Sequence, residues 1–507
     1  MKLTAEELKK TKEWEAAEIA VPSYDRKKVI EETGKHPTWV HFGAGNIFRG
    51  YIAVLQEELL ERGLETTGIL AAEGYDGEMI HRIYEPHDNL SLVVTLCADG
   101  TMKKRIVGSV TEGIAAGEPD GRKRLLDVFA APSLQMVSFT ITEKGYAPEN
   151  PTMQLVMELL CHRFLQGGSP IAVVSMDNCS HNGEKLRNAI LAAAEAGRKN
   201  GSVTEECLSY LSDENRVSFP WSMIDKITPR PAESVERQLA DCGVEEMTPI
   251  VTERKTFLAP FVNTEVAQYL VIEDCFPNGR PALEQAGVYF TDRDTVNAVE
   301  RMKVTTCLNP LHTALAVFGC LLGYTRISDE MKDEELSELV ERLGRQEGMR
   351  VVTDPGILSP QGFLNEVLTE RFPNPFIPDT PQRIATDTSQ KIPVRFGETL
   401  KAYEQSRELK TKELRYIPFV FAGWLRYLNG TDDNGKPMEL SPDPRLSELK
   451  QKLSQGRLDE ILEDKTIFGV NLREVGLADR VKEQYQEMLA GNGAVRTACK
   501  CILSLDK

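Results

Sequence analysis

The sequence predicts an α/β domain followed by a mainly α-helical domain. Short apolar runs at 38–42 and 67–72 flank a glycine-rich turn and a stretch of helical periodicity, which is the order of a strand–turn–helix–strand unit. After Pro281 the strand-like runs give way to helical patterns. These helical stretches run over 295–347, 360–370 and 395–428.

The length of 507 residues exceeds what one small core supports, so at least two domains are expected. We place the α/β domain at 1–290, with its core at 38–255, and the helical domain at 291–507. No internal repeat or low-complexity linker separates them, so we expect closely packed domains with the substrate held between them.

Composition excludes several classes of protein. The net charge of −17 argues against nucleic acid and anionic membrane surfaces, whose recognition needs a basic face. Ten cysteines without a CxxC pattern favour a reduced, cytoplasmic protein. The charged N-terminus has no apolar signal core, and we expect no membrane span. We therefore predict a small-molecule ligand and a monomer or weak homo-oligomer.

The first strand–turn–helix–strand unit carries the features of a dinucleotide-binding fold. Its turn glycines would let the backbone approach a pyrophosphate at a helix N-terminus. Acidic side chains after the second strand would accept hydrogen bonds from the ribose and repel a 2′-phosphate, so NAD is favoured over NADP. The predicted cofactor residues are Gly43, Ala44, Gly45, Asn46, Ile47, Arg49, Glu73 and Asp76.

This glycine motif departs from the usual pattern, because Phe48 stands where a third glycine is expected. The alternative is a glycine-rich turn that serves only chain geometry. Further strands are predicted at 91–96 and 135–142, and the second of them ends in a turn that carries Thr142, Glu143 and Lys144. Cofactor sites of open α/β sheets lie at such strand ends, and we add these three residues to the predicted NAD site.

A lysine, an asparagine and a histidine lead into the apolar run that ends at Gly323. Asn309 followed by Pro310 predicts a helix start with the amide as cap, and Asn309 and His312 then share a face. Lys303 would point away from both on one unbroken helix. Either the helix begins at Asn309 and Lys303 arrives on a bend, or one residue bulges out ahead of Pro310. The plainer alternative is a buried helix with a capping Asn, a hydrogen-bonded His and a surface Lys.

Two further polar residues follow strand-like segments. Asn178 comes shortly after the apolar run 170–175, and Asp225 is a lone acid in a loop–strand piece. Each could equally be an ordinary turn or capping residue. No metal site is predicted, because the seven histidines are scattered, with no HExxH and no Cys/His cluster.

Taken together, these segments resemble the polyol-specific long-chain dehydrogenases of the mannitol dehydrogenase family. The resemblance covers nearly everything from residue 38 to about 445. It is carried by HFGAGNIFRG at 41–50, TITEKGY at 140–146, DN at 177–178 with NG at 182–183, MIDKITP at 223–229, VIEDCFP at 271–277, ERMK at 300–303, Asn309 with His312, and Arg383 with Lys391.

The resemblance implies a metal-independent hydride transfer in which Lys303 is the acid/base. It further implies that Asn309 and Asn178 hold the reacting oxygen, and that His312 bonds a neighbouring hydroxyl. Asp225 would orient the lysine or substrate, and Glu300 would connect the lysine to solvent. Five residues separate Lys303 from Asn309, where mannitol dehydrogenases of this type have four. This difference favours the bulge ahead of Pro310.

For the substrate, the resemblance implies an NAD-dependent interconversion of a keto sugar acid or ketose and its alcohol. The motifs look closest to the branch that reduces fructuronate to mannonate, and Arg383, Lys391 and Arg395 offer positive charge for a carboxylate. Interconversion of mannitol and fructose is the first alternative and tagaturonate reduction the second. A different class also stays open: an NAD-binding sensor, or an epimerase that retains NAD.

Overall fold

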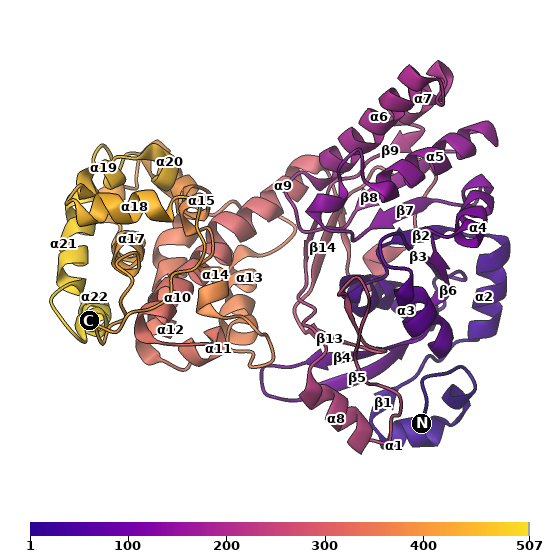
Figure 1. Ribbon diagram of the computed structural model, residues 1–507, viewed down its shortest axis with the longest axis horizontal. Coiled ribbons are helices and arrows are strands. Elements are labelled where there is room, and N and C mark those ends of the chain that lie inside the picture. Colours follow the sequence, from indigo (N-terminus) through magenta and orange to yellow (C-terminus); the bar gives the residue numbers. More distant parts are fainter. Residues whose placement is uncertain (505–507) are drawn as a thin grey trace. The chain divides into compact units, whose positions relative to one another are not determined.

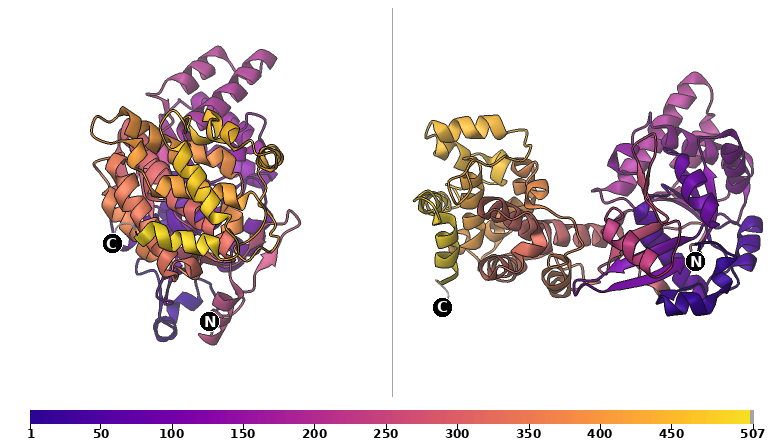
Figure 2. Two further views of the ribbon diagram at one scale, coloured as in Figure 1. Left: turned by 90° about the vertical axis from the view of Figure 1, so that its left-hand side faces the viewer. Right: turned by 60° about the horizontal axis from the view of Figure 1, so that its bottom comes forward.

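The computed structural model describes residues 1–504, which divide into two compact units, Met1–Asn297 and a second unit from Ala298 onward (Figure 1). The division falls seven residues beyond the predicted boundary at 290/291, inside helix α9 (Arg293–Met302). The first unit holds all the strands, and the second is built from helices (Figure 2).

A six-stranded parallel sheet forms the centre of the first unit. Its strands, in spatial order, are β6 (Val110–Ala115), β3 (Ile69–Glu73), β2 (Trp39–Phe42), β7 (Met136–Phe139), β8 (Ile171–Ser175) and β9 (Val217–Ser218). Counted along the chain within this sheet, the order is 3-2-1-4-5-6, which is typical of dinucleotide-binding domains. The predicted α/β fold is thereby confirmed.

Both faces of this sheet are covered, which explains why its strands are nearly continuous apolar runs. Successive residues of β2 alternate between the two cores, with Val40 and Phe42 in one and Trp39 in the other. The core of Val40 is closed by α4 (Pro119–Ala130), α5 (Pro151–Leu165), α6 (Asn182–Asn200) and α7 (Glu205–Ser212), and the other by α3 (Ala53–Glu61).

Smaller sheets complete the first unit. The predicted strand at 91–96 is β4 (Ser91–Leu96), but it belongs to a separate four-stranded sheet and not to the central one. That sheet also contains β1 (Ile19–Ala20), β5 (Met102–Val107) and β13 (Phe261–Glu265). A three-stranded sheet contains β10 (Ser222–Asp225), β14 (Tyr269–Glu273) and β15 (Tyr289–Thr291), and a hairpin pairs β11 (Ile250–Val251) with β12 (Phe257–Leu258).

The second unit packs around two buried helices, α10 (Asn309–Leu322) and α17 (Tyr416–Tyr427). Every residue of α17 is buried. The surrounding helices are α12 (Glu334–Arg342), α13 (Pro360–Glu366), α14 (Pro381–Ile384), α15 (Thr388–Ile392), α16 (Glu398–Gln405), α18 (Leu446–Ser454), α21 (Ala478–Met488) and α22 (Ala494–Ser504). The predicted helical C-terminal domain is confirmed.

The helical stretch Arg293–Leu322, which includes α9 and α10, is long and apolar enough to cross a membrane by length and composition, although the sequence led us to expect no such stretch. Within the structure, 83% of its apolar window is buried. This burial is typical of a core helix, and α10 fills that role in the second unit.

Candidate active site

The loops that follow β2 and β7 lie at the point where the strand order reverses, where open α/β sheets bind ligands. Gly43 has φ +98°, and a Cβ there would stand 2.2 Å from the Thr140 carbonyl oxygen, so only glycine lets the two loops touch. At Gly45 a Cβ would meet nothing within 4 Å. The helix that begins at Asn46 offers its unpaired first N–H groups beside this open space. These backbone features fit a pyrophosphate.

Glu73 and Asp76, predicted to meet the ribose, are both largely buried. The Glu73 carboxylate accepts hydrogen bonds from the N–H groups of Ala44 (3.0 Å), Tyr75 (2.8 Å) and Asp76 (3.1 Å). Burial raises the pKa of this carboxyl, and these N–H groups oppose the rise. Glu73 thus connects the glycine turn to the end of β3 by hydrogen bonds.

Asp76 is held in the same manner, because its Oδ2 accepts hydrogen bonds from the hydroxyls of Thr252 and Thr256, each at 2.6 Å. The two carboxylates therefore shape the loop on which the ribose would rest. Their direct contact with a ribose remains a prediction.

Arg49 needs a correction. It is fully buried, and its guanidinium donates to Ser91 Oγ and to the Ala259 carbonyl oxygen, beneath the Tyr84 ring. A side chain with no exposed surface cannot contact a cofactor directly. We therefore revise its predicted role to holding the π-helical segment Phe48–Ile52 against the rest of the first unit.

The turn after β7 keeps its predicted residues at the surface. Thr142, Glu143 and Lys144 are all exposed, and Thr142 has φ +66°, a strained conformation for a threonine. The strain is maintained by Asp177, whose carboxylate accepts the N–H groups of Ile141 (2.8 Å) and Thr142 (3.0 Å). Sequence reasoning noted Asp177 only as part of a motif and missed this anchoring role.

The remaining candidates of the first unit have different surroundings. Asn178 is exposed beside this turn, whereas Asp225 is buried at the end of β10. Neither the Asn178 nor the Asp225 prediction is decided by this placement. Neighbouring Asn182 is structural, since its amide bonds Ser222 and the ends of β8.

In the second unit, the predicted bulge ahead of Pro310 is present. Lys303–Cys307 forms a π-helical turn, and α10 follows at once. On a regular helix Lys303 and His312 would point about 180° apart, nine residues at about 100° each. One inserted residue reduces this separation to about 80°. The π-turn therefore brings the lysine, which is almost fully buried, toward the face of His312.

The predicted capping role of Asn309 is wrong. The N-cap position is Leu308, and no side chain caps the helix. The half-buried Asn309 carboxamide has no hydrogen-bond partner among residues 1–504, while its carbonyl oxygen accepts from Thr313 Oγ1 and Arg395 Nη1. Its amide is thus available to a ligand. Glu300 lies one helical turn before Lys303 and is partly exposed, as a connection to solvent requires.

Positive charge gathers around His312. Burial, and then the charges of Arg395, Arg383, Arg371 and Lys391, lower the pKa of His312 to about 3. The imidazole is therefore neutral at ordinary pH. Of these cations, Arg371 was not predicted, because it stands in an unremarkable helical stretch.

The predicted substrate residues are oriented by local contacts. Arg395 donates to Thr313 Oγ1 at 2.6 Å, and burial lowers the pKa of its guanidinium to about 10. Lys391 Nζ donates to the carbonyl oxygens of Ile384 and Thr386, and burial together with Arg395 lowers its pKa. Arg383 has a 64% exposed side chain and pairs with Asp379.

Asp379 is the acid within this cation cluster, and sequence reasoning missed it. Its Oδ2 lies 3.3 Å from His312 Nε2, a buried nitrogen that has no hydrogen-bond partner among residues 1–504. We regard the contact as electrostatic. Phe372 covers the other side of the imidazole, with ring centres 5.2 Å apart. The only sequence signal for Asp379 was its position four residues before Arg383.

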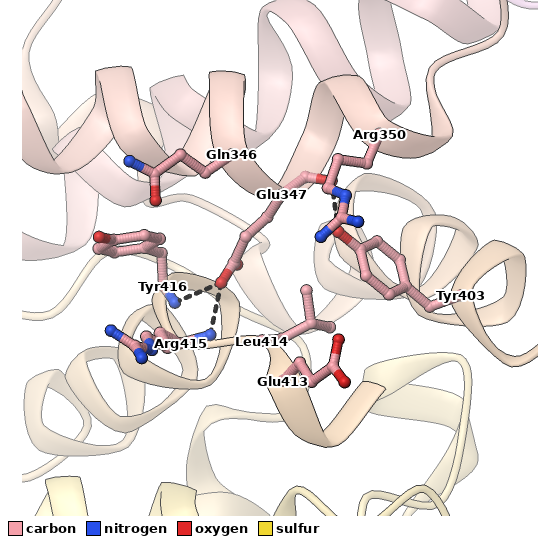
Figure 3. A pocket seen from close by; sticks show the side chains of 8 residues that line it. All are labelled: Gln346, Glu347, Arg350, Tyr403, Glu413, Leu414, Arg415 and Tyr416. Carbon is pink, nitrogen blue, oxygen red and sulfur yellow. Dashed lines mark hydrogen bonds between the residues drawn. The ribbon is translucent and has the colours of Figure 1, made fainter. Parts of the chain in front are cut away.

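A separate cavity of about 200 Å³ lies in the second unit and contains none of the predicted residues (Figure 3). It is lined by Gln346, Glu347, Arg350, Tyr403, Glu413, Leu414, Arg415 and Tyr416. The Glu347 carboxylate accepts the N–H groups of Arg415, Tyr416 (2.9 Å) and Ile417 (2.8 Å) at the start of α17. We assign this cavity to helix capping and not to the active site.

Comparisons with known proteins agree with this geometry. The mannitol dehydrogenase Rossmann domain model matches residues 37–284, and the mannitol dehydrogenase C-terminal domain model matches residues 295–489. The chain is 49% identical to D-mannonate oxidoreductase of Thermotoga maritima over 98% of each chain. It is 30% identical to mannitol 2-dehydrogenase of Neosartorya fischeri over 93% of each.

Two solved structures are similar over almost the whole chain. A substrate-free D-sorbitol dehydrogenase aligns with a TM-score of 0.80 at 27% identity, covering 95% of this chain and 98% of the other. The Pseudomonas fluorescens mannitol 2-dehydrogenase in complex with NAD and D-mannitol aligns with a TM-score of 0.69 at 26% identity. That alignment covers 99% of this chain and all of the other.

Proposed function

The chain belongs to the mannitol dehydrogenase family, and from this premise we propose that it reduces D-fructuronate to D-mannonate with NADH. It is an NAD-dependent oxidoreductase that interconverts a keto sugar acid and its alcohol. The 49% identity to a D-mannonate oxidoreductase over nearly the full chain supports this choice of sugar acid.

The observation that carries the proposal is the cation cluster around His312. Four cationic side chains act on this imidazole, and one of them, Arg383, pairs with the carboxylate of Asp379. Arginine can bind a carboxylate with two parallel hydrogen bonds. A cluster of this composition therefore suits the carboxylate of a sugar acid better than a neutral polyol.

In this mechanism the first unit holds the cofactor. The backbone at Gly43, Gly45 and Asn46 would bind the pyrophosphate, and the loop shaped by Glu73 and Asp76 would receive the ribose. The turn of Thr142, Glu143 and Lys144 would border the same site. Bound NADH supplies the hydride for reduction of the carbonyl carbon.

Residues of the second unit transfer the proton. Lys303 donates it to the carbonyl oxygen during reduction and recovers it through Glu300 from solvent. The Asn309 carboxamide stabilises the negative charge that develops on that oxygen. The neutral His312 imidazole binds a neighbouring hydroxyl, and Arg383, Lys391 and Arg395 hold the carboxylate. Asn178 is assigned to holding the reacting oxygen, and Asp225 to orienting the lysine or the substrate.

The test is NADH consumption by the purified protein with fructuronate, tagaturonate and fructose under matched conditions. We expect fructuronate to give the highest kcat/KM, and NADH to exceed NADPH by at least about tenfold, since the acidic loop disfavours a 2′-phosphate. Rapid reduction of fructose with no turnover of fructuronate would establish a mannitol 2-dehydrogenase instead, which the relatives at about 30% identity favour. No turnover of any substrate would favour an NAD-binding sensor.

A further inference from the structure

Two cysteines on neighbouring helices of the first unit lie unusually close together. Cys161 is near the end of α5, and Cys207 is in the first turn of α7. Their Sγ atoms are 2.6 Å apart, with the Cys207 thiol directed at Cys161. By comparison, Cys161 Sγ lies 3.8 Å from its other sulfur contact, Met157 Sδ.

This separation is close to what a covalent bond requires. A disulfide has an S–S length of about 2.05 Å, so closure needs a sulfur displacement of about half an ångström. The two helices already pack against each other in one core, so their backbones need not be brought together. Cys207 is 4% exposed, whereas Cys161 is partly exposed and gives an oxidant access to the pair.

We propose that Cys161 and Cys207 form a reversible intramolecular disulfide by exchange with a small disulfide such as glutathione disulfide. The Cys161 thiolate attacks the small disulfide, forms a mixed disulfide and releases one thiol. Cys207 then attacks the Cys161 sulfur, and the second small thiol leaves. In sum, two protein thiols are oxidised to one disulfide while one glutathione disulfide is reduced to two glutathiones.

The position of this pair predicts what the bond would change. Cys161 lies at the end of α5 that leads to the start of β8, and α7 leads to the start of β9. The cofactor loops follow the opposite, carboxyl ends of the parallel strands, so NADH binding should be unaffected. The bond would close a loop that contains β8 and α6 and restrict the unfolded chain. We expect it to raise Tm by roughly 5–10 °C.

The experiment uses the full-length protein with Cys501→Ser, which removes the exposed thiol of α22. The folded protein is incubated with glutathione disulfide, its remaining thiols are alkylated, and trypsin digestion follows. The expected product is a cross-linked pair of peptides, 145–163 and 200–216, which dithiothreitol separates. Tm should rise on oxidation and return on reduction, with NADH affinity unchanged.

Variants provide the controls. Cys161→Ser should abolish both the cross-link and the Tm shift, while Cys275→Ser, which removes another partly exposed thiol of the first unit, should retain both. Recovery of Cys161 and Cys207 as separate alkylated or glutathione-modified peptides would overturn the proposal. This peptide result on the parent protein decides the question even if Cys161→Ser does not fold.

Discussion

The proposed cofactor half, in the first unit, and the proposed substrate half, in the second unit, are built in opposite ways. At the cofactor end, the charged side chains of the motifs are bonded inside the protein: Glu73 to backbone N–H groups, Asp76 to threonines, and Arg49 through Nε and Nη2 to Ser91 and a carbonyl. What remains for a ligand there is mostly backbone. At the substrate end, four cations act on His312, and the Asn309 carboxamide has no hydrogen-bond partner among residues 1–504.

This difference follows from the ligands that each half would bind. A pyrophosphate is recognised by a fixed row of N–H groups, which requires a rigid loop and small residues. A sugar acid is recognised by charge and by individually placed polar groups. The cofactor half should therefore be sensitive to atoms added beside its backbone. The substrate half should be sensitive to the functional groups of its side chains.

The largest expected effect is on chemistry at Lys303. Lys303→Ala should lower kcat by at least ~100-fold, the usual scale of acid/base catalysis, while NADH affinity stays within about twofold. Added primary amines should restore part of the rate. Stopped-flow measurement of hydride transfer and NADH fluorescence titration would check both statements.

Lys401→Ala is the matched control, since Lys401 lies on α16 and only pairs with Glu398 at the surface. A Lys303→Ala variant that kept more than a third of the parent kcat, with hydride transfer limiting turnover, would show that another group handles the proton. The substrate half would then contribute charge to substrate binding, without Lys303 as the proton donor.

The glycines of the cofactor turn offer the next test. Gly43→Ala places a Cβ 2.2 Å from a carbonyl oxygen at φ +98°, and should cost at least ~2 kcal/mol of stability. Gly45→Ala meets no protein atom, so Tm should stay unchanged while the Kd for NADH rises ~10-fold. Denaturation and titration measured on the same samples would separate these effects. Unchanged NADH affinity in Gly45→Ala would move the pyrophosphate elsewhere.

A third effect should be confined to one substrate. Arg383→Lys keeps the charge but loses the planar fork, so the KM for fructuronate should rise ~10-fold and that for fructose much less. Arg350→Lys, which changes an arginine of the cavity in Figure 3, should alter neither constant. Equal changes for both substrates in Arg383→Lys would mean that Arg383 does not meet the carboxylate.

The sequence predicted the central sheet well because its information is local. Each buried strand is a short apolar run closed by turn residues. The spacing of Lys303, Asn309 and His312 predicted either a bend or a bulge, and the extra residue relative to mannitol dehydrogenases favoured the bulge that is present as the π-turn. The strand at 91–96 was also predicted, but its membership of a second sheet depends on pairing with residues more than 160 positions away.

The side-chain roles were harder to predict, because they depend on which way a residue faces. Arg49 and Asn309 each carry a polar group suited to a ligand. Arg49 points into the protein, and Asn309 is left without a capping contact. Asp379 and Arg371 join the cation cluster from segments far from His312 in the chain, and no spacing rule connects them.

The smallest effect concerns pH and tests whether burial and the cation cluster lower the pKa of His312. With its pKa lowered to about 3, His312 stays neutral from pH 5.5 to 7.5, so its titration should change the KM for fructuronate less than twofold over that range.

Between pH 6.5 and 3 the unfolded chain takes up a proton at this position that the folded chain does not. Stability therefore falls as pH falls, by up to about 1.4 kcal/mol per pH unit. His312→Gln should remove this contribution and flatten the loss of stability on acidification. His41, whose pKa burial also lowers to about 3, remains in both proteins, so the difference between their unfolding curves isolates His312. Identical curves would show that neither burial nor the cations lower the pKa of His312 in the folded protein.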